Sequence, residues 1–445
     1  MWQQLLLNRR ELTTEEGEPI RIIHPGRSND DQGADFRNAI IITKRGLIKG
    51  DIEVHVKSSD WRAHRHHQDP AYNWVILHVV MWHNSKAAIT LQNGKGIPTL
   101  ALHHYLTDTT NWWLRQDCQA TLNAPCLEVS HGWNKGTIAE FLDGAGEERF
   151  LAKANRFQAD MAQMGPSQSL YQGIMRALGY AKNKLSFLEL ARRLPLQVLE
   201  SMTQSEMPDE ECLAWEQALL LGTAGLLPSQ RSNWHLENKS DGKWIDKLEK
   251  LWGSFGYTET MSDSAWHLFK VRPNNFPVRR IVAMTYMILR YREKGILEEV
   301  INMIKETPLS KGYHRVVDGL LVTTEGYWAN HFDFGLDSKV KAKSLLGKRR
   351  AADIAVNVIL PFTFAWSQFA SQPELKQKSL DLYHSCPKLV DNTVERHMSN
   401  QLGLDSSLVN SAQRQQGLIH IYNTQCTQGK CHCCPLGQLK AGDHI

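Results

Sequence analysis

Polar and apolar residues alternate most strictly between Lys49 and Lys57, and this alternation predicts a β-strand. The apolar side of that strand carries Ile52, Val54 and Val56. The other side carries a row of ionisable residues instead of small polar ones: Asp51, Glu53, His55 and Lys57. Two carboxylates, an imidazole and an amine in a row can hold a divalent cation and move protons, so this strand is the first candidate for chemistry.

Similar short runs bounded by Gly, Pro, Asn and Asp indicate further strands in the first 130 or so residues. The expected strands are Ile20–His24, Ala39–Thr43, Leu47–Val56, Tyr72–Trp82, Ala87–Gln92 and Thr99–Leu106. The turn at Arg45-Gly46 predicts that the second and third of these strands form a hairpin. We therefore expect a mixed or antiparallel β-rich domain over residues 1–134.

From about residue 135 the apolar spacing becomes helical, with apolar residues three and four positions apart. The expected helices are Thr137–Met164, Ser167–Leu178, Asp209–Leu226, Lys243–Phe255, Val278–Leu289, Leu297–Lys305, Ala351–Ile359, Phe362–Phe369, Glu374–His384, Leu389–Leu402 and Leu408–Asn423. Pro361 is expected to separate two helices, and Gly312–Gly335 is expected to form a hairpin. The fold class is thus α+β, with a mainly helical domain over residues 135–445.

Length and composition describe an ordinary globular chain of more than one domain, with 445 residues, 42% hydrophobic and 22% charged. No apolar run is long enough for a membrane span, and the apolar stretch near Met1 is too short for a secretion signal, so a cytoplasmic location is expected. The net charge of +4 is weak evidence for nucleic acid as a partner.

The acidic strand has a possible partner upstream, because Asp35 precedes the strand before it and Glu53 follows 18 residues later. Nucleases of the PD-(D/E)xK class resemble this arrangement, with carboxylates on a hairpin that hold Mg²⁺ or Mn²⁺ and a lysine two residues after the Glu. Here His55 occupies the lysine position, and Lys57 lies two residues further on. Asp35, Glu53, His55 and Lys57 are therefore the candidate catalytic residues, with Asp35, Asp51 and Glu53 as metal ligands. The alternative is a solvated strand face or an internal row of salt bridges.

Histidines gather just after this strand, at His64, His66 and His67, and His78 lies within the next expected strand. Imidazoles beside carboxylates suit Mn²⁺, Fe²⁺ or Zn²⁺ better than Mg²⁺. His78 points away from Leu77 and Val79, so it either joins the metal site or is a buried core histidine. The alternative for His64, His66 and His67 is that they are ordinary loop residues without a metal.

Half of the eight cysteines lie in nine residues near the C-terminal end: Cys426, Cys431, Cys433 and Cys434. Such crowding indicates metal binding rather than disulfides. Zn²⁺ held by three thiolates and one more ligand is the first choice, and an iron–sulfur cluster is the second. The fourth ligand is open among Cys433, His432, His420, Cys386 and a residue of the β-rich domain. Unliganded reduced thiols are the alternative.

Two basic stretches in the helical part are candidate recognition features. Residues 176–184 end a helix at Gly179, which suits a positive φ angle. Arg272, Arg279 and Arg280 flank a helix start at Pro277 and could contact phosphates there. The alternative is that these arginines cap or pair within the fold.

With these residues in hand, the chain resembles a bacterial family known as domain-of-unknown-function family 2851. The resemblance covers nearly the whole length and rests on residues 50–55, 59–61, 77–80, 177–180, 272–277 and 416–419 and on the closing cysteines. The family brings no established activity. The resemblance implies that the acidic strand and the cysteine cluster occur together as features of the same family. Cys433 is an extra thiol beside the three that the family leads us to expect.

The leading hypothesis is a metal-dependent phosphodiester hydrolase, nuclease-like, with nucleic acid as the expected partner and a structural metal at the cysteines. A non-enzymatic nucleic-acid or protein-binding module is the first alternative. A metal hydrolase or oxygenase acting on a small molecule is the second, and it is favoured if His64, His66 and His78 are ligands. The sequence leaves the substrate, the metal and the oligomeric state open.

Overall fold

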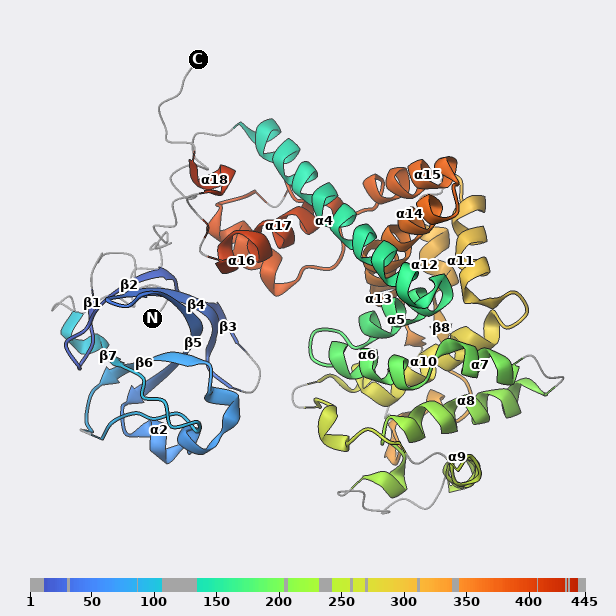
Figure 1. The fold of residues 1–445 in the computed structure, drawn as a ribbon, viewed down its shortest axis with the longest axis horizontal. Coiled ribbons are helices and arrows are strands. Elements are labelled where there is room, and N and C mark those ends of the chain that lie inside the picture. The colour runs from blue at the N-terminus through green and yellow to red at the C-terminus, as the bar shows by residue number, and fades with distance from the viewer. Residues whose placement is uncertain are drawn as a thin grey trace. The chain divides into compact units, whose positions relative to one another are not determined.

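A seven-stranded mixed sheet organises the N-terminal part of the protein in this computed structural model (Figure 1). The structure describes residues 12–29, 33–85, 87–105, 134–203, 207–231, 242–256, 259–268, 271–309, 313–337, 344–405, 407–428, 430 and 433–438. The strands are β1 (Leu12–Thr13), β2 (Pro19–His24), β3 (Arg27–Ser28), β4 (Phe36–Thr43), β5 (Gly46–Lys57), β6 (Val75–Trp82) and β7 (Thr99–Ala101). Their order is β1-β2-β4-β5-β6-β7, and β3 pairs with β4.

Strand β5 lies at the centre of this order and has a different partner on each side. It pairs antiparallel with β4 through the expected hairpin, in which Thr43 lies opposite Gly46. It pairs parallel with β6, which pairs parallel with β7. The parallel pairing aligns Glu53 with His78. It makes the sheet mixed, whereas the sequence allowed either a mixed or an antiparallel sheet.

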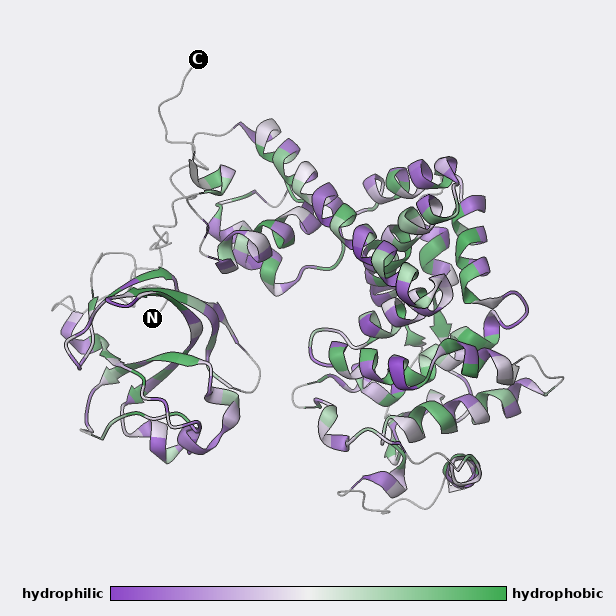
Figure 2. Ribbon diagram, viewed as in Figure 1, coloured by the Kyte–Doolittle hydropathy of each residue, from purple (hydrophilic) through white to green (hydrophobic). Residues whose placement is uncertain are grey.

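The apolar face of β5 belongs to the main core of the sheet, as its alternation predicts. Ile52 is fully buried there with Ile41, Leu77 and Leu100. Figure 2 shows hydrophobic residues running along the strands of this sheet. Gly50 is required for space, because a Cβ there would lie 2.3 Å from a side-chain carbon of Ile76 and 2.6 Å from the Trp74 carbonyl oxygen.

The polar face of β5 is also covered, by a smaller core that the sequence did not predict. The segment between β5 and β6 forms helix α2 (Asp60–Ala63) and two 3₁₀ turns, His66–Gln68 and Pro70–Tyr72. Trp61 of this segment packs in a small core with buried residues from other parts of the chain: Ala34, Val75, Ile89, Leu91 and Ile97. Both faces of β5 are therefore shielded from water between Gly50 and Glu53, whereas Val56 and Lys57 at its end are exposed.

The chain divides into two compact units, and the division differs from the expected boundary at 134/135. Unit 1 comprises residues 1–145, 391–409 and 414–445, and unit 2 comprises residues 146–390 and 410–413. The C-terminal helices that were expected in the helical domain thus group with the sheet. In unit 1 they form a small core with the start of α4 (Lys135–Met164), which includes Leu142, Met398 and Leu418.

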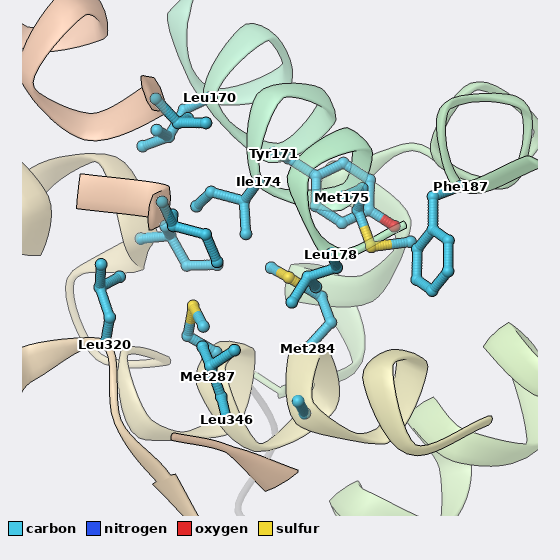
Figure 3. Close-up of a cluster of buried hydrophobic side chains, with 14 of the residues drawn as sticks. Leu170, Tyr171, Ile174, Met175, Leu178, Phe187, Met284, Met287, Leu320 and Leu346 are labelled. Atoms are coloured by element: carbon cyan, nitrogen blue, oxygen red, sulfur yellow. The ribbon is translucent and has the colours of Figure 1, made fainter. Parts of the chain in front are cut away.

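Helices make up most of unit 2 and of the C-terminal part of unit 1. They are α5 (Pro166–Leu178), α6 (Lys184–Arg193), α7 (Leu196–Thr203), α8 (Asp209–Thr223), α9 (Gly242–Ser254), α10 (Pro277–Arg290), α11 (Gly295–Glu306), α12 (His314–Gly319), α13 (Lys348–Ile354), α14 (Leu360–Phe369), α15 (Pro373–His384), α16 (Thr393–Gln401), α17 (Ala412–Thr424) and α18 (Pro435–Gln438). Figure 3 shows how α5 packs over α10 in the core of unit 2, with Ile174, Met284 and Met287 among the buried side chains.

Three expected elements differ from the structure. Pro361 does not separate two helices, because a π-helical turn (Ala355–Ile359) joins α13 to α14 and Pro361 occupies the first turn of α14, where a missing N–H is tolerated. Residues 312–335 form α12 and parts of two small sheets, in which β8 (Val322–Thr323) pairs with β11 (Ser344–Leu346) and β9 (His331–Asp333) with β10 (Leu336–Asp337). Residues 87–92 contribute one bridge, Thr90 to Gly96, rather than a strand.

Helices α16 and α17 contact the sheet of unit 1 through a buried histidine pair. The His24 ring at the end of β2 lies 5.7 Å from the His397 ring on α16 and 6.2 Å from the Tyr422 ring on α17. Burial, the nearby His397 and Lys49 lower the pKa of His24 to about 4, against a backbone hydrogen bond with Asn38 that raises it. Burial and the charge of Arg27 also lower the pKa of His397. Both imidazoles are therefore neutral in the folded protein near pH 7.

This pair predicts a loss of stability in mild acid. As the pH falls from 6.5 to about 4, His24 becomes protonated in the unfolded chain but stays neutral in the folded chain. The free energy of unfolding therefore decreases over this range. The His24 contribution reaches roughly 3 kcal/mol at the bottom of that range. Urea unfolding at pH 7, 6 and 5 measures it, with His24→Gln as the comparison. We expect a shallower pH dependence in the variant, since the other buried histidines act equally in both proteins. Equal slopes would contradict the assignment.

Candidate metal centre

Three histidines converge on the polar face of β5. His55 comes from β5 itself, His64 follows α2, and His66 opens the next 3₁₀ turn. Their ligand nitrogens all lie within 4.8 Å of one another. His66 is buried, His55 is half-buried and His64 is exposed, so the cluster has a closed inner side and an open rim.

Glu53 completes the inner side of this cluster. Its Oε1 lies 3.4 Å from His55 Nε2 and 3.3 Å from His66 Nε2. His64 Nδ1 lies 3.2 Å from His55 Nε2. A tetrahedral ion with bonds of about 2.0–2.1 Å holds its ligand atoms about 3.3–3.4 Å apart. These three separations are close to that edge length, and the three histidine nitrogens all lie within 4.8 Å of one another.

The loop that brings His64 and His66 back to the strand depends on two local features. Trp61 is fully buried, and its indole nitrogen donates a hydrogen bond to the Thr90 carbonyl oxygen at 3.1 Å. Its ring contacts those of His66 and His78. Arg65 adopts a left-handed backbone conformation with φ of 60°, which is uncommon for a residue other than glycine. That conformation reverses the chain between the two histidines and points both at His55.

His78 supports the cluster from behind and is not itself one of the grouped ligands. It is fully buried, and its Nε2 lies 2.9 Å from His55 Nδ1. A hydrogen bond to one imidazole nitrogen fixes the tautomer and leaves the other nitrogen available as a ligand. The predicted ligand His78 is therefore placed in the site as the residue that orients His55.

Hydrogen bonds from backbone amides to both carboxylates link Asp35 and Glu53, as a hairpin of this kind allows. The Asp35 amide donates to Glu53 Oε2 at 2.9 Å, and the Val54 amide donates to Asp35 Oδ2 at 3.1 Å. The expectation that both residues belong to one site is consistent with this arrangement. One Asp35 oxygen is already engaged by the backbone, so Asp35 acts mainly to position Glu53.

Asp51 and Lys57 lie further from the cluster than their neighbours on β5. Asp51 accepts a hydrogen bond from the Asn38 amide at 3.0 Å and faces the Arg37 guanidinium at 3.6 Å. Lys57 is exposed, and the structure gives its ammonium group no hydrogen bond or ion pair with a described residue. Neither residue lies among the grouped donor atoms in the described part of the chain.

Burial favours the neutral form of the ionisable groups in and beside this cluster. It lowers the pKa of His55 to about 4, with further lowering by His66 and His64 against Asp60, and it lowers the pKa of His78 to about 3. Burial also raises the pKa of Glu53, opposed by a hydrogen bond with His66. Neutral imidazoles present free nitrogen lone pairs at neutral pH, which is the form that binds metal ions.

The other predicted site residues lie elsewhere. Arg279 and Arg280 are buried inside unit 2, where Arg279 donates to the Trp328 and His331 carbonyls and Arg280 to the Leu345 carbonyl. They serve the fold there, and no phosphate can reach them on a surface. Arg272 is exposed.

The structure describes three of the four cysteines that cluster near the C-terminal end. Cys426 and Cys434 are buried in the small core of unit 1, with Cys426 Sγ 3.9 Å from Met398 Sδ, and Cys433 is exposed. Cys431 lies outside the described residues.

The comparisons with known proteins give a family and nothing further. The chain matches the family model described as "Protein of unknown function (DUF2851)" over residues 1–392, and it belongs to that family. No curated protein and no solved structure matches it. No helix in the described part of the chain has the length and hydropathy to cross a membrane.

Metal binding at this cluster is directly measurable. We expect purified protein to bind Zn²⁺ or Mn²⁺ by calorimetric titration, and His66→Ala to lose most of this affinity, because it removes the buried nitrogen of the set. His67→Ala is the matched control, since His67 is the next residue in the same turn and is not in the group. Equal affinity in the two variants would remove His66 from the site.

Proposed function

With membership of this family as the premise, we propose that the protein is a metal-dependent hydrolase of phosphodiester bonds. The observation that supports the proposal is the convergence of His55, His64 and His66 beside Glu53. Three protein ligands with an open fourth position are the arrangement of catalytic rather than structural metal sites. The exposed His64 places that open position toward solvent, where a substrate can enter.

Nitrogen donors favour a first-row transition metal at this position. Imidazoles suit Zn²⁺, Fe²⁺ and Mn²⁺, whereas Mg²⁺ prefers oxygen ligands. We therefore propose Zn²⁺ or Mn²⁺ in place of the expected choice between Mg²⁺ and Mn²⁺. Such an ion lowers the pKa of bound water and polarises a phosphoryl oxygen.

The chain's own residues supply the remaining chemistry. Glu53 lies against two of the imidazoles and can accept the proton of an attacking water, while the Asp35 amide holds its other oxygen in place. His78 keeps His55 in the orientation that leaves its Nε2 inward. Arg37, beside Asp51 on the neighbouring strand, brings a cation that a phosphodiester anion can contact. We place Lys57, exposed beyond His55, as a substrate contact.

Nucleic acid is the substrate class that we propose for this hydrolase. The support is the hairpin that joins Asp35 to Glu53, which resembles the metal-binding hairpin of PD-(D/E)xK nucleases apart from His55 at the lysine position. A non-enzymatic binding module would use the same residues without turnover, so hydrolysis is the property to test.

Replacing Glu53 by Gln should abolish hydrolysis and leave the metal in place. The neutral amide keeps the size of the side chain but cannot take a proton, so we expect the rate to fall by roughly 10²–10⁴-fold. The measurement is cleavage of bis(p-nitrophenyl) phosphate and of a labelled oligonucleotide with Zn²⁺ or Mn²⁺ present. Glu18→Gln, a carboxylate before β2 in the same unit, is the control. Retained cleavage with bound metal would exclude Glu53 as the base. If the wild type binds metal and cleaves neither substrate, the hydrolase proposal fails.

The cysteines form the second part of the proposal. We place a structural metal at Cys426, Cys431, Cys433 and Cys434, with Zn²⁺ first and an iron–sulfur cluster second. The burial of Cys426 and Cys434 in the core shared by α4, α16 and α17 supports a structural role, since a metal there would fasten these helices together. The fourth ligand stays open.

Metal analysis of anaerobically purified protein tests the cysteine site separately. We expect Cys431→Ser to lose one equivalent of Zn²⁺ or iron and to retain the metal of the histidine cluster. Cys212→Ser is the control, because Cys212 is a buried cysteine in unit 2, on α8. Identical metal content in the two variants would leave these thiols unliganded.

A further inference from the structure

Unit 2 carries a concentration of cations that the proposed hydrolase does not use. Arg149, Lys153 and Arg156 are spaced by four and three residues along α4, and this spacing puts them on one face of the helix. Like charges at that spacing repel one another along a helix. This face of α4 therefore carries three basic residues in unit 2, with Asp160 one turn further along.

Three more cations approach this face from neighbouring elements. Arg176 lies in the last turn of α5, Lys184 opens α6, and Arg350 lies in α13. The charges of Arg176, Arg149 and Arg350 all act on Lys184, and burial together with these charges lowers its pKa. Burial first, and then the charges of Arg149, Arg156 and Lys184, lower the pKa of Lys153 well below its usual value, and its Nζ donates a hydrogen bond to Asn357 Oδ1. The six side chains thus form one electrostatic cluster, named here the cationic cluster.

The turn between α5 and α6 is built to hold two of these cations in place. Gly179 was expected to take a positive φ, but its φ is −69° and Tyr180 takes the left-handed conformation instead, with φ of 53°. Gly179 is needed for space, because a Cβ there would lie 2.4 Å from the Asn183 carbonyl oxygen. A tight turn with a strained non-glycine residue fixes the distance between Arg176 and Lys184.

Arg350 has donor groups that the fold leaves without an acceptor. One of its nitrogens lies 3.3 Å from Asp353 Oδ2, and the guanidinium stacks on the Tyr180 ring. Its Nε and Nη2 are buried and have no hydrogen-bond partner among the described residues. Buried donors without acceptors are costly and rare in native structures. An anion at the cationic cluster would accept from them.

We propose that Arg149, Lys153, Arg156, Arg176, Lys184 and Arg350 form a binding site for a phosphate-bearing anion. The forked donors of arginine match phosphate oxygens, and several cations suit a ligand with several negative charges. Asp353 is the carboxylate whose contact with Arg350 is described above. The chemistry fits either the backbone of a nucleic acid strand or a free polyphosphate. The site lies within unit 2 and does not depend on the metal centre of unit 1.

The test measures binding of two probes to the full-length protein. The probes are sodium triphosphate, by calorimetry, and a fluorescein-labelled ten-nucleotide thymidine strand, by anisotropy. The cluster variant is Arg156→Gln with Lys184→Gln, two exposed positions. The control variant is Arg192→Gln with Lys243→Gln, which removes the same charge from exposed positions on α6 and α9. Circular dichroism confirms the fold of each.

We expect the cluster variant to bind at least one probe roughly tenfold or more weakly than the control variant. For the oligonucleotide, the slope of log affinity against log salt should become shallower by about 1.4, because two phosphate contacts are lost. Loss confined to triphosphate would identify a free polyphosphate, and loss with the changed slope would identify a nucleic acid strand. Equal binding by the two variants, or no binding of either probe to wild type at millimolar concentration, would overturn the proposal. A protein that binds through this cluster and cleaves nothing would retain this site and lose only the proposed hydrolase function.

Discussion

The central constraint in unit 1 is that the middle of β5 is covered on both faces while one face carries ionisable side chains. Glu53 is 5% exposed and Asp51 is 6% exposed, so neither can rely on water. A buried charge without a partner costs several kcal/mol. The surrounding elements therefore have to provide partners: the Asp35 amide for Glu53, the Asn38 amide and Arg37 for Asp51, and His78 for His55. The parallel register of β6 also contributes, because it places His78 beside these residues.

The cover over this face explains why the cluster can be both dry and accessible. Trp61 and Tyr72 supply apolar surface that excludes water from the inner side, and the Tyr72 and His66 rings lie 3.9 Å apart. His64 sits at the rim, one residue before the left-handed Arg65. Strain of that kind persists only when surrounding contacts over-determine it, and it concentrates at functional sites. Here the buried Trp61 provides those contacts, so the loop holds its histidines before any ligand arrives.

The α+β class and the β4–β5 hairpin were predictable from the sequence, because both rest on local periodicity and a short turn. The partner that β5 takes on its other side was not, since a parallel neighbour gives no local signal. The same limit applies to the site. Asp35 and Glu53 are joined by a hairpin and could be paired from spacing alone. His64 and His66 looked like loop residues, because the reversal at Arg65 that aims them at His55 is set by the packing of Trp61. The one available signal was the density of histidines beside an acidic strand. The prediction that Arg279 and Arg280 contact phosphates failed for the same reason. Their carbonyl partners come from elements 49 to 65 residues away in the chain.

The two units solve the problem of buried ionisable groups in opposite ways. In unit 1, burial lowers the pKa of His55 and His78, so these imidazoles are neutral near pH 7 and need no counter-ion. Arginine has no such escape, because its guanidinium remains protonated at any physiological pH. One guanidinium nitrogen of Arg350 contacts Asp353 Oδ2 at 3.3 Å, and its other two nitrogens are buried donors without acceptors among the described residues. The histidines of the candidate metal centre are therefore neutral before a metal binds, whereas the arginines of the cationic cluster stay charged and attract anions from a distance.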